Sequence, residues 1–474
     1  MIKDGPKSKR CNTSKVKCHN NESDDIGYGD DMDGSDATVM IMILIIMMIL
    51  IYVCLLPCSL SLLKSITMSG KMKLVVCGGG GGSHALAGIA ACDPDIEVRV
   101  LTLFEDEAER FTNEQQKHDF SVFYHHHGKE VKTAKPPKKF VITKKPEEVV
   151  PGCDVIVLVL PAFAHEKYIK AAFPFLEPGM IIAGLPGQPG FEFEVRSILK
   201  EKVKFCTLAS FESLPWVCRV REFGKSVDLF GLKEKTKGAI QLAETPPKVD
   251  AHLTLQRCVG TPSKLETKGH ILGTTLMAVN AILHPSITYL KWKDWDGQPV
   301  DEPPIFYSEL SKESADFVYQ VSLESVAIAK KIMSERPGLD LSTAVSIYDY
   351  YCRVFPDEIE DKSSFYTLIH TMSPHKNLRH PMIKTDDGKY VPDKKSRYLL
   401  EDVPIGLVVL CGIAEIVGIA APKMLEVLTW AQKQMGKEYL VDGKICGKDL
   451  GETRAPQRFG ISNITQLLGD ELIA

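Results

Sequence analysis

Residues 72–88 read MKLVVCGGGGGSHALAG, an apolar run that breaks into five glycines and then re-enters small, helix-forming residues. The run 73–77 predicts a short buried strand, and HALAGIAAC (84–92) predicts a helix that packs closely on a sheet. A second strand, IEVRVLTLF, is expected at 96–104. A strand, a glycine-rich turn and a helix in this order predict a dinucleotide-binding βαβ unit rather than a flexible glycine tract.

The glycines fit the positions that such a turn requires. Gly78 permits the tight turn, Gly80 lets a pyrophosphate approach the backbone, and Ser83 is small enough for close helix–strand packing. The cofactor-binding residues predicted here are Gly78, Gly80, Gly81, Ser83 and His84. The usual acidic residue at the end of the second strand is missing, and Glu105 and Asp106 come slightly late. NAD is therefore favoured over NADP.

The rest of the chain divides into a part with alternating strand and helix patterns and a part with mainly helical patterns. Further strands are expected at 155–160, 180–184 and 203–210, with helices at 105–119 and 161–176. Long helical patterns follow at 271–283, 313–335 and 405–420. The predicted fold is an α/β Rossmann domain at 72–268 followed by an all-α domain at 272–474.

Composition narrows the class of protein. The 474 residues carry a net charge of −4, which argues against a basic nucleic-acid-binding surface. The 13 cysteines are scattered without a CxxC pair, so free thiols in a reducing, cytoplasmic compartment are expected. The triplet HHH at 125–127 is predicted to lie in a solvated loop, and no metal site is expected.

The first 67 residues have an apolar segment at 38–56. The run from Val39 to Leu56 carries no charge and is long enough to span a membrane as a helix. Acidic residues precede it and lysines follow it, which would place the domain after it in the cytosol. The alternative is that residues 1–67 are a start-site extra, because Met68 or Met72 offers a natural start.

Two loops of the first domain could carry substrate-binding groups. GLPGQPGF (184–191) follows a strand and contains Gln188. SFESLPWVCRV (210–220) follows the next strand and brings Glu212, Ser213 and Cys218 together. The carboxyl ends of parallel strands line the cofactor crevice, so both loops are expected near it.

Two segments of the second domain hold candidate catalytic groups. LHPS places His284 directly before Pro285, which is expected to end a helix at the domain border. SRYLLEDVPIG (396–406) holds Arg397 and Asp402 before a long apolar helix. From the residues alone, His284 is either an acid–base group or an ordinary helix-end histidine. Asp402 is either a functional carboxylate or a helix N-cap, and Arg397 is either a ligand or a surface charge.

Taken together, these segments resemble the opine dehydrogenases, the octopine dehydrogenase group of marine invertebrates, over essentially all of residues 72–462. CGGGGGSHALAG, PAFAHEKY, GLPGQPGFEF, SFESLPWVCRVREFG, HPSITYLKWKDWDGQPV, SRYLLEDVPIG and TRAPQRFG carry the resemblance. It implies a Rossmann domain and a helical domain with the active site between them. It also implies NADH-dependent reductive condensation of an amino acid with pyruvate to an opine, by a monomer that needs no protein or nucleic-acid partner.

The resemblance also assigns roles. His284 would be the acid–base group, Asp402 would orient it, and Arg397 would bind a substrate carboxylate. The remaining residues that it implies are Gln188, Glu212, Ser213 and Cys218 for the substrates, and Pro161 and Phe163 for the cofactor. Ala278, Asn280, Ser213 and Tyr350 depart from the pattern expected of octopine-forming relatives, so the amino substrate stays open among arginine, alanine, glycine, taurine and β-alanine.

Two other readings remain open. One is a 2-hydroxy acid or glycerol-phosphate dehydrogenase, although no lysine occurs in LHPS or SRYLLEDV. The other is a membrane-anchored protein that binds a nucleotide without turnover, which would require residues 38–56 to be present in the mature protein.

Overall fold

The computed structural model describes residues 71–470, apart from residues 127, 128 and 262. They belong to a compact unit delimited as Met68–Ala474. The apolar segment 38–56 lies outside the described residues. Within the described part of the chain, no helix combines the length and the apolar character that crossing a bilayer requires.

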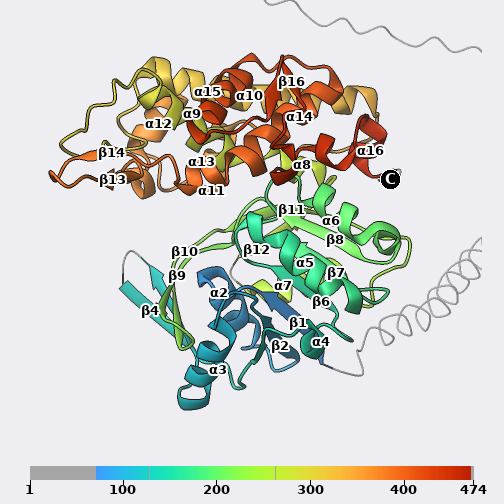
Figure 1. Cartoon of the computed structure of the whole chain (residues 1–474). Helices are drawn as coiled ribbons and strands as arrows, with labels where there is room; N and C mark the ends of the chain where they lie inside the picture. Colours follow the sequence, from blue (N-terminus) through green and yellow to red (C-terminus); the bar gives the residue numbers. More distant parts are fainter. Residues whose placement is uncertain (1–70, 127–128, 262, 471–474) are drawn as a thin grey trace, which may run out of the picture. The chain divides into compact units, whose positions relative to one another are not determined.

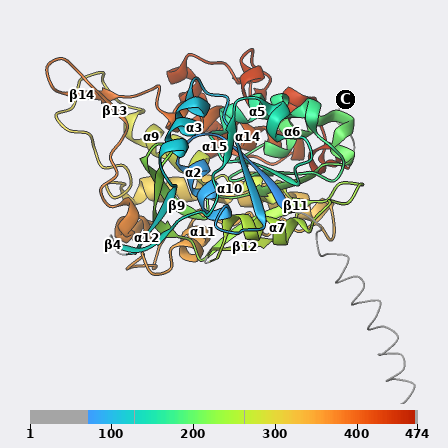
Figure 2. The ribbon, with the colours of Figure 1, turned by 90° about the horizontal axis from the view of Figure 1, so that it is seen from below.

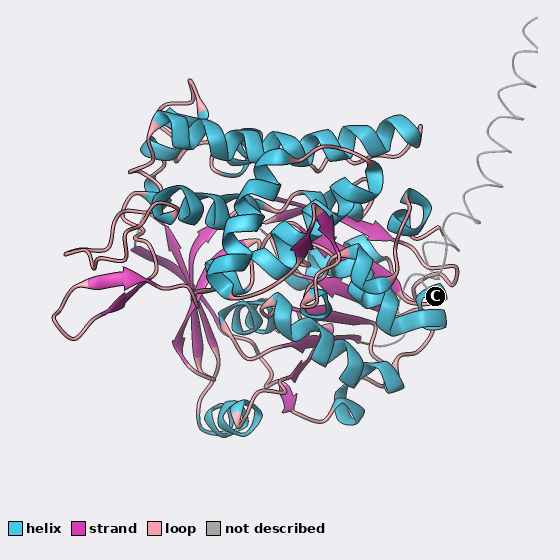
Figure 3. Ribbon diagram, turned by 45° about the horizontal axis from the view of Figure 1, so that its top comes forward, coloured by secondary structure: helices cyan, strands magenta, loops and turns pink. Residues whose placement is uncertain are grey.

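An eight-stranded sheet forms the centre of the first domain (Figure 3). Its strands are β1 (Met72–Cys77), β2 (Ile96–Leu101), β5 (Val141–Thr143), β6 (Val155–Leu158), β7 (Ile181–Gly184), β8 (Thr207–Phe211), β11 (Lys235–Gln241) and β12 (Lys264–Thr267). Their order is β12-β11-β8-β7-β6-β1-β2-β5, and all strands from β8 to β5 are parallel. The six strands from β5 to β8 have the order of a dinucleotide-binding Rossmann sheet. Every residue of β6 and β7 is buried, as strands covered on both faces must be.

Helices cover this sheet at the positions that the sequence indicates. They are α2 (Gly81–Ala90), α3 (Glu107–Lys117), α4 (Pro146–Val149), α5 (His165–Ala172), α6 (Phe191–Leu199) and α7 (Ala251–Val259). Helix α2 begins earlier than predicted, because its first turn already contains the last glycines of the tract. The expected helix 161–176 is shorter and is flanked by 3₁₀ turns at Ala162–Ala164 and Phe173–Phe175.

A second sheet, which the sequence did not indicate, packs beside α2 in the first domain. It consists of β4 (Lys129–Ala134), β3 (Ser121–His126), β10 (Ser226–Leu232) and β9 (Trp216–Glu222), in that order. The loop predicted at 125–127 is therefore wrong for His125 and His126, which lie in β3. The side chain of His125 is largely buried, with its Nε2 2.7 Å from Asp228 Oδ1 on β10. Residue 127 lies outside the described residues.

The second domain is predominantly helical, and its yellow to red helices gather on one side of the Rossmann domain (Figures 1 and 2). Its helices are α8 (Leu272–Leu276), α9 (Val279–Trp292), α10 (Lys312–Glu335), α11 (Ile347–Val354), α12 (Phe365–Thr371), α13 (Arg397–Leu400), α14 (Val408–Val417), α15 (Pro422–Met435) and α16 (Ile464–Leu468). Two hairpins accompany them, β13 (Met382–Lys384) with β14 (Tyr390–Pro392) and β15 (Leu440–Val441) with β16 (Lys444–Ile445). A core of buried side chains from α9, α10, α14 and α15 holds the helices together.

The expected helix 271–283 is two helices, separated at Met277 and Ala278. The expectation that Pro285 ends a helix is also wrong, because α9 continues through this proline to Trp292. A proline inside a helix removes one hydrogen bond, and the cost is met here by tertiary packing: both Pro285 and Ile287 are buried in α9.

Candidate active site

A cavity of about 920 Å³ lies where the two domains meet. The first domain lines it with the glycine turn and with the segments that follow β6, β7 and β8. The second domain lines it with residues of α8, α9, α11 and α13. The carboxyl ends of the parallel strands thus open into the cavity, where Rossmann folds bind their ligands.

The glycine turn is shaped to receive a ligand at the start of α2. Gly78 has a φ of 115°, which favours glycine, and a side chain on Gly79 would collide with Glu107. A Cβ at Gly80 would meet no atom within 4 Å, so this backbone is open toward the cavity. No side chain caps α2, which leaves its first N–H groups and the positive end of its dipole free for an anion.

Five of the predicted site residues do not line the cavity: Ser83, His84, Cys218 and the pair His284 and Asp402. The Ser83 hydroxyl donates to the carbonyl of Val159 and so holds the turn against β6. His84 is fully buried and stacks on Phe111, and its Nε2 accepts from the Gly224 N–H. Burial lowers the pKa of His84 to about 4, against a raising hydrogen bond to the backbone.

Cys218 is the third of these residues, and it lies in β9 rather than in a loop. Burial raises the pKa of its thiol to about 11. Such a thiol is neutral at physiological pH, so Cys218 contributes a small apolar surface behind α2.

His284 and Asp402 form a close pair, although they are 118 positions apart in the chain. The Nδ1 of His284 lies 2.8 Å from Oδ2 of Asp402, and each side chain is only 12% exposed. Asp402 precedes a π-helical turn, η5 (Val403–Leu407), but its side chain caps no helix N-terminus. The N-cap reading of Asp402 is therefore excluded.

Local packing explains how the pair forms. Helix α9 and η5 cross so closely that a Cβ on Gly406 would come within 2.3 Å of the Ala281 Cβ. Only a glycine permits this approach, which brings the residue before η5 against the next turn of α9. π-helical turns are rare and are frequent at functional sites.

Aromatic groups fix the His284 ring from its other sides. The ring stacks on Tyr398 with centroids 3.9 Å apart, and Nε2 lies 3.2 Å from the Tyr307 hydroxyl. Burial raises the pKa of Tyr307 well above its usual value, so this hydroxyl is neutral. His284 and Asp402 are not on the wall of the cavity, but Asn280, one turn earlier in α9, and Arg397 are.

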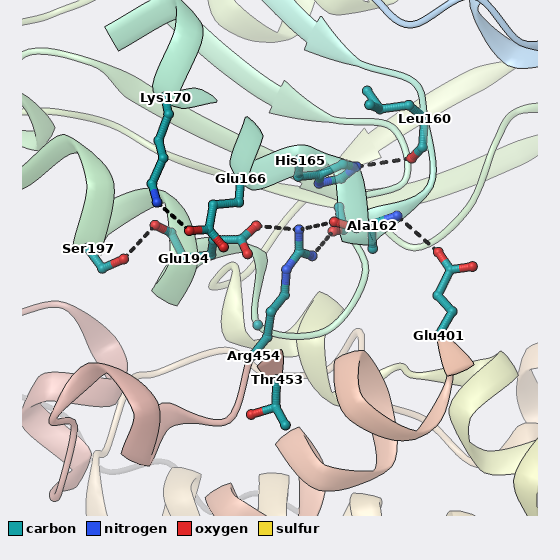
Figure 4. A network of polar contacts seen from close by, with 12 residues as sticks. Leu160, Ala162, His165, Glu166, Lys170, Glu194, Ser197, Glu401, Thr453 and Arg454 are labelled. Atoms are coloured by element: carbon teal, nitrogen blue, oxygen red, sulfur yellow. Dashed lines mark hydrogen bonds and ion pairs between the residues drawn. The ribbon is translucent and has the colours of Figure 1, made fainter. Parts of the chain in front are cut away.

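Arg397 pairs with Glu401, which belongs to a network that joins the two domains (Figure 4). The Arg397 side chain is 67% exposed, whereas Glu401 is nearly buried. Glu401 Oε1 accepts from the backbone N–H of Ala162, 3.0 Å away. This carboxylate therefore connects α13 to the Pro161–Ala164 segment, whose Pro161 and Phe163 line the cavity.

Arg454 holds the same segment from the opposite side. Its guanidinium is buried and donates to the Ala162 carbonyl at 3.0 Å and to Glu194 Oε2 at 2.5 Å (Figure 4). It also donates to the carbonyl of Gly187 at 3.0 Å. The next residue, Gln188, lines the cavity with a φ of 64°, an uncommon backbone conformation for a residue with a side chain. Arg454 thus supports both the Pro161–Ala164 segment and the strained backbone beside Gln188.

Glu212 and Ser213 line the cavity, as predicted, but Glu212 already has a cationic partner. Arg353 of α11 donates two hydrogen bonds to it, at 2.8 and 2.7 Å. Lys233 lines the cavity beside them. Burial lowers the pKa of Lys233 to about 8; Glu212 opposes this shift, and Arg353 adds to it.

Sequence reasoning missed five residues of this site: Glu107, Lys233, Arg353, Glu401 and Arg454. Glu107 lies one position beyond the late acidic residues of the second strand, and it lines the cavity near Gly79. Arg454 lies in TRAPQRFG, one of the segments that carry the family resemblance, and this is the one sequence feature that points to it. No sequence feature near Lys233, Arg353 or Glu401 indicates a role in the site. Among the residues that the structure describes, no cluster of histidine, cysteine or acidic side chains could hold a metal ion, and the cysteines are free.

Comparisons with known proteins agree with this arrangement. The alpha-helical domain of NAD/NADP octopine/nopaline dehydrogenases matches residues 267–435. The tauropine dehydrogenase of Arabella iricolor is 49% identical over 395 residues, which cover 83% of this chain and 99% of that protein. The opine dehydrogenase of Haliotis discus hannai is 44% identical over 405 residues, covering 85% and 99%.

Solved structures give the same result. An octopine dehydrogenase structure with NADH and L-arginine superposes with a TM-score of 0.80 at 40% identity, covering 85% of this chain and 98% of that one. A structure of octopine dehydrogenase with NADH and pyruvate superposes with a TM-score of 0.78 at 39% identity, with the same coverage.

Proposed function

This chain belongs to the opine dehydrogenase family, and we propose that it condenses an amino acid with pyruvate and reduces the product with NADH. The amine and the keto carbon form a C=N bond with loss of water. When bound, NADH supplies the hydride that reduces this bond to a secondary amine. From the ammonium form of the amino acid to the ammonium form of the secondary amine, each turnover consumes one proton, and the oxygen that leaves as water must also be protonated, so the site needs a group that transfers protons.

The pairing of His284 with Asp402 is the observation that carries this function. Asp402 accepts a hydrogen bond from the Nδ1–H of His284 and so leaves Nε2 as the nitrogen that exchanges a proton with the substrate. The carboxylate also stabilises the imidazolium, as in serine protease triads. On substrate binding, the carbonyl oxygen of pyruvate replaces the Tyr307 hydroxyl as the partner of Nε2 and receives the proton as it leaves in water.

Arg397 is the group best placed to hold a substrate carboxylate. It lines the cavity, and its exposed guanidinium keeps donors free beside Glu401. A planar guanidinium binds a carboxylate through two parallel hydrogen bonds. Gln188 and Ser213 line the same cavity and would complete the binding of pyruvate and the amino acid.

The cofactor would lie along the glycine turn. The uncapped start of α2 suits a pyrophosphate, and Pro161 and Phe163 border the continuation of the cavity. Glu107 lies beside Gly79 and would accept hydrogen bonds from the ribose hydroxyls. A carboxylate at this place repels a 2′-phosphate, which favours NADH over NADPH.

Domain limits and location complete the proposal. The Rossmann domain would extend over 72–268 and the helical domain over 272–474, with the chain acting as a monomer in the cytosol. Cysteines that are all free in the described residues support a reducing compartment. An anchor at 38–56 is tested by sequencing the N-terminus of the mature protein and by separating membranes from the cell extract.

NADH oxidation by the full chain tests the proposed function. We expect oxidation with pyruvate and an amino acid together, and a product with the mass of an N-(1-carboxyethyl) amino acid. Rapid oxidation with pyruvate alone would instead indicate a 2-hydroxy acid dehydrogenase. No oxidation with any amino acid would indicate nucleotide binding without turnover.

A further inference from the structure

One wall of the cavity combines two charged and two neutral polar side chains from distant parts of the chain. Glu212 and Ser213 follow β8, Lys233 follows β10, and Tyr350 belongs to α11. All four residues line the cavity that also contains Gln188 and Arg397. This wall therefore lies within reach of a substrate in the same cavity.

The negative charge on this wall is already neutralised. Arg353 lies behind Glu212 and donates to both of its carboxylate oxygens, while the Lys237 N–H donates to Oε1 at 3.1 Å. The Glu212 side chain is 0% exposed. The Arg353 guanidinium also lies 5.3 Å from the ring centre of Tyr350. Glu212 is thus held in place and has its charge matched before any substrate binds.

Lys233 feels the opposing charges of Glu212 and Arg353 but forms no direct ion pair. Among the residues that the structure describes, no carboxylate lies within ion-pairing distance of its ammonium group and no side chain hydrogen bonds to it. The nearby Ser213 hydroxyl is buried beside the Tyr350 hydroxyl, and it can turn from this neighbour to donate to a ligand in the cavity. With Lys233 protonated, Glu212, Arg353 and Lys233 sum to one positive charge, and two donors are available for an anion.

We propose that this wall binds the acid group of the amino substrate through Lys233 and Ser213, and that Arg353 excludes cationic side chains by occupying Glu212. This inference rests on the proposed opine dehydrogenase activity and adds the class of amino substrate. The preferred substrate is a short amino acid with a carboxylate or sulfonate and no cationic group. L-Arginine is disfavoured because its guanidinium finds no free carboxylate here and meets Lys233, with Arg353 lying behind Glu212.

The kinetics of the wild-type full chain give the first test. Taurine, β-alanine, glycine, L-alanine and L-arginine are each assayed with pyruvate and NADH, so the sulfonate and carboxylate forms of the acid group are compared directly. Like charges at an interface strongly disfavour the wrong partner, so we expect kcat/KM for L-arginine to be about 10²-fold below that of the best short acid. Equal or higher kcat/KM for L-arginine would overturn the inference. Absence of activity with every amino acid would overturn the proposed function itself.

Replacing Arg353 gives the second test. The variant Arg353→Gln releases Glu212, so we expect the ratio of kcat/KM for L-arginine to that for the best short acid to rise about tenfold or more, which is the effect of one modest charge interaction. Arg353→Lys keeps the charge and should keep the wild-type ratio. An unchanged ratio in Arg353→Gln would overturn the role of Arg353.

Lys233→Met tests the anion-binding group independently. We expect the KM of the short amino acid to rise about tenfold or more while the KM of pyruvate changes little, because one charge-assisted hydrogen bond is lost. Lys235→Met is the matched control, since Lys235 lies on the exposed side of β11 and pairs with Glu266. An equal effect of both variants on the KM of the amino acid would overturn the role of Lys233.

Discussion

Two histidine–aspartate pairs in this molecule have nearly the same geometry. His284 and Asp402 are 2.8 Å apart, with both side chains 12% exposed. His125 and Asp228 are 2.7 Å apart, with exposures of 12% and 11%. Distance and burial alone would give both pairs the same role.

The neighbours of the two aspartates differ. Arg221 donates to Asp228 from Nε and from its terminal nitrogen, so His125 is one of two donors to a saturated carboxylate. Burial alone would raise the pKa of Asp228, but the hydrogen bonds from Arg221 and His125 outweigh it and lower the pKa. This pair connects β3 to β10 in the outer sheet.

Asp402 has no arginine partner among the described residues, and its side chain pairs there with the imidazole of His284. The free nitrogen of His284 faces a neutral hydroxyl next to the cavity, whereas His125 has no place in the cavity wall. A histidine–aspartate pair is therefore suited to catalysis when its carboxylate has no arginine partner and the second nitrogen of its imidazole can reach a ligand.

Changing each aspartate to asparagine gives the largest contrast. Asp402→Asn should lower kcat/KM about 10²–10⁴-fold, because an amide cannot stabilise the imidazolium or hold its tautomer. Asp228→Asn should change kcat/KM by less than about twofold, because the contacts that it weakens, with Arg221 and His125, lie in the outer sheet and not at the reacting groups. Steady-state kinetics with saturating pyruvate measure both. Similar losses in the two variants would remove the distinction between the pairs.

A buried carboxylate that is neutralised by an arginine should contribute to the stability of the fold, and Glu194 with Arg454 is such a pair. Arg454→Met leaves the buried carboxylate of Glu194 without its partner, so we expect the free energy of unfolding to fall by about 3–5 kcal/mol. Arg458→Met is the control, because its pair with Glu166 is partly exposed and should contribute about 1 kcal/mol or less. Urea denaturation followed by tryptophan fluorescence provides the measurement. Equal losses would mean that the Arg454 network is no stronger than a surface ion pair.

The charged wall predicts a pH dependence that separates binding from proton transfer. Lys233 has a pKa of about 8, so it is charged below pH 8 and loses its charge as the pH rises. Above pH 8 the KM of the amino acid should therefore rise about tenfold per pH unit, because the protonated fraction falls by that factor. Glu212 and Arg353 are the charged groups that act on this ammonium group. The KM of Lys233→Met should lack this rise, and a rise of the same size in that variant would assign it to another group.

The smallest effect is expected at the structural pair. His125→Gln should lower the free energy of unfolding by about 1 kcal/mol, because one hydrogen bond between β3 and β10 is lost while Arg221 still neutralises Asp228. Thermal unfolding gives the difference. A loss of activity without a loss of stability would give this pair a functional role.

The sequence predicted the parts of the fold that local pattern determines. The glycine turn, the apolar strands β6 and β7 and the long helix α10 each follow from residues that are neighbours in the chain. The sheet of β3, β4, β9 and β10 was missed because β3 pairs in parallel with β10, about a hundred residues away. His284 was a candidate because histidine is a common acid–base group. The helix end predicted at Pro285 was wrong, because tertiary packing lets α9 continue through the proline.

Partners across the fold could not be predicted. Nothing near Glu212 in the sequence shows that Arg353 will bind it, and a lysine after a strand carries no sign of burial. The same limit applies to Arg454, whose three acceptors belong to two separate segments of the first domain. Such contacts depend on how the domains pack, which no single segment determines.

The most direct test of the catalytic assignment compares two full-length variants, His284→Ala and His125→Ala, in NADH oxidation with pyruvate and the best amino acid. If His284 delivers the proton, its variant should lose about 10²–10⁴-fold in kcat while His125→Ala stays within about twofold of wild type. More than about a tenth of wild-type kcat in His284→Ala, far above the range expected for losing an acid–base group, would contradict the assignment.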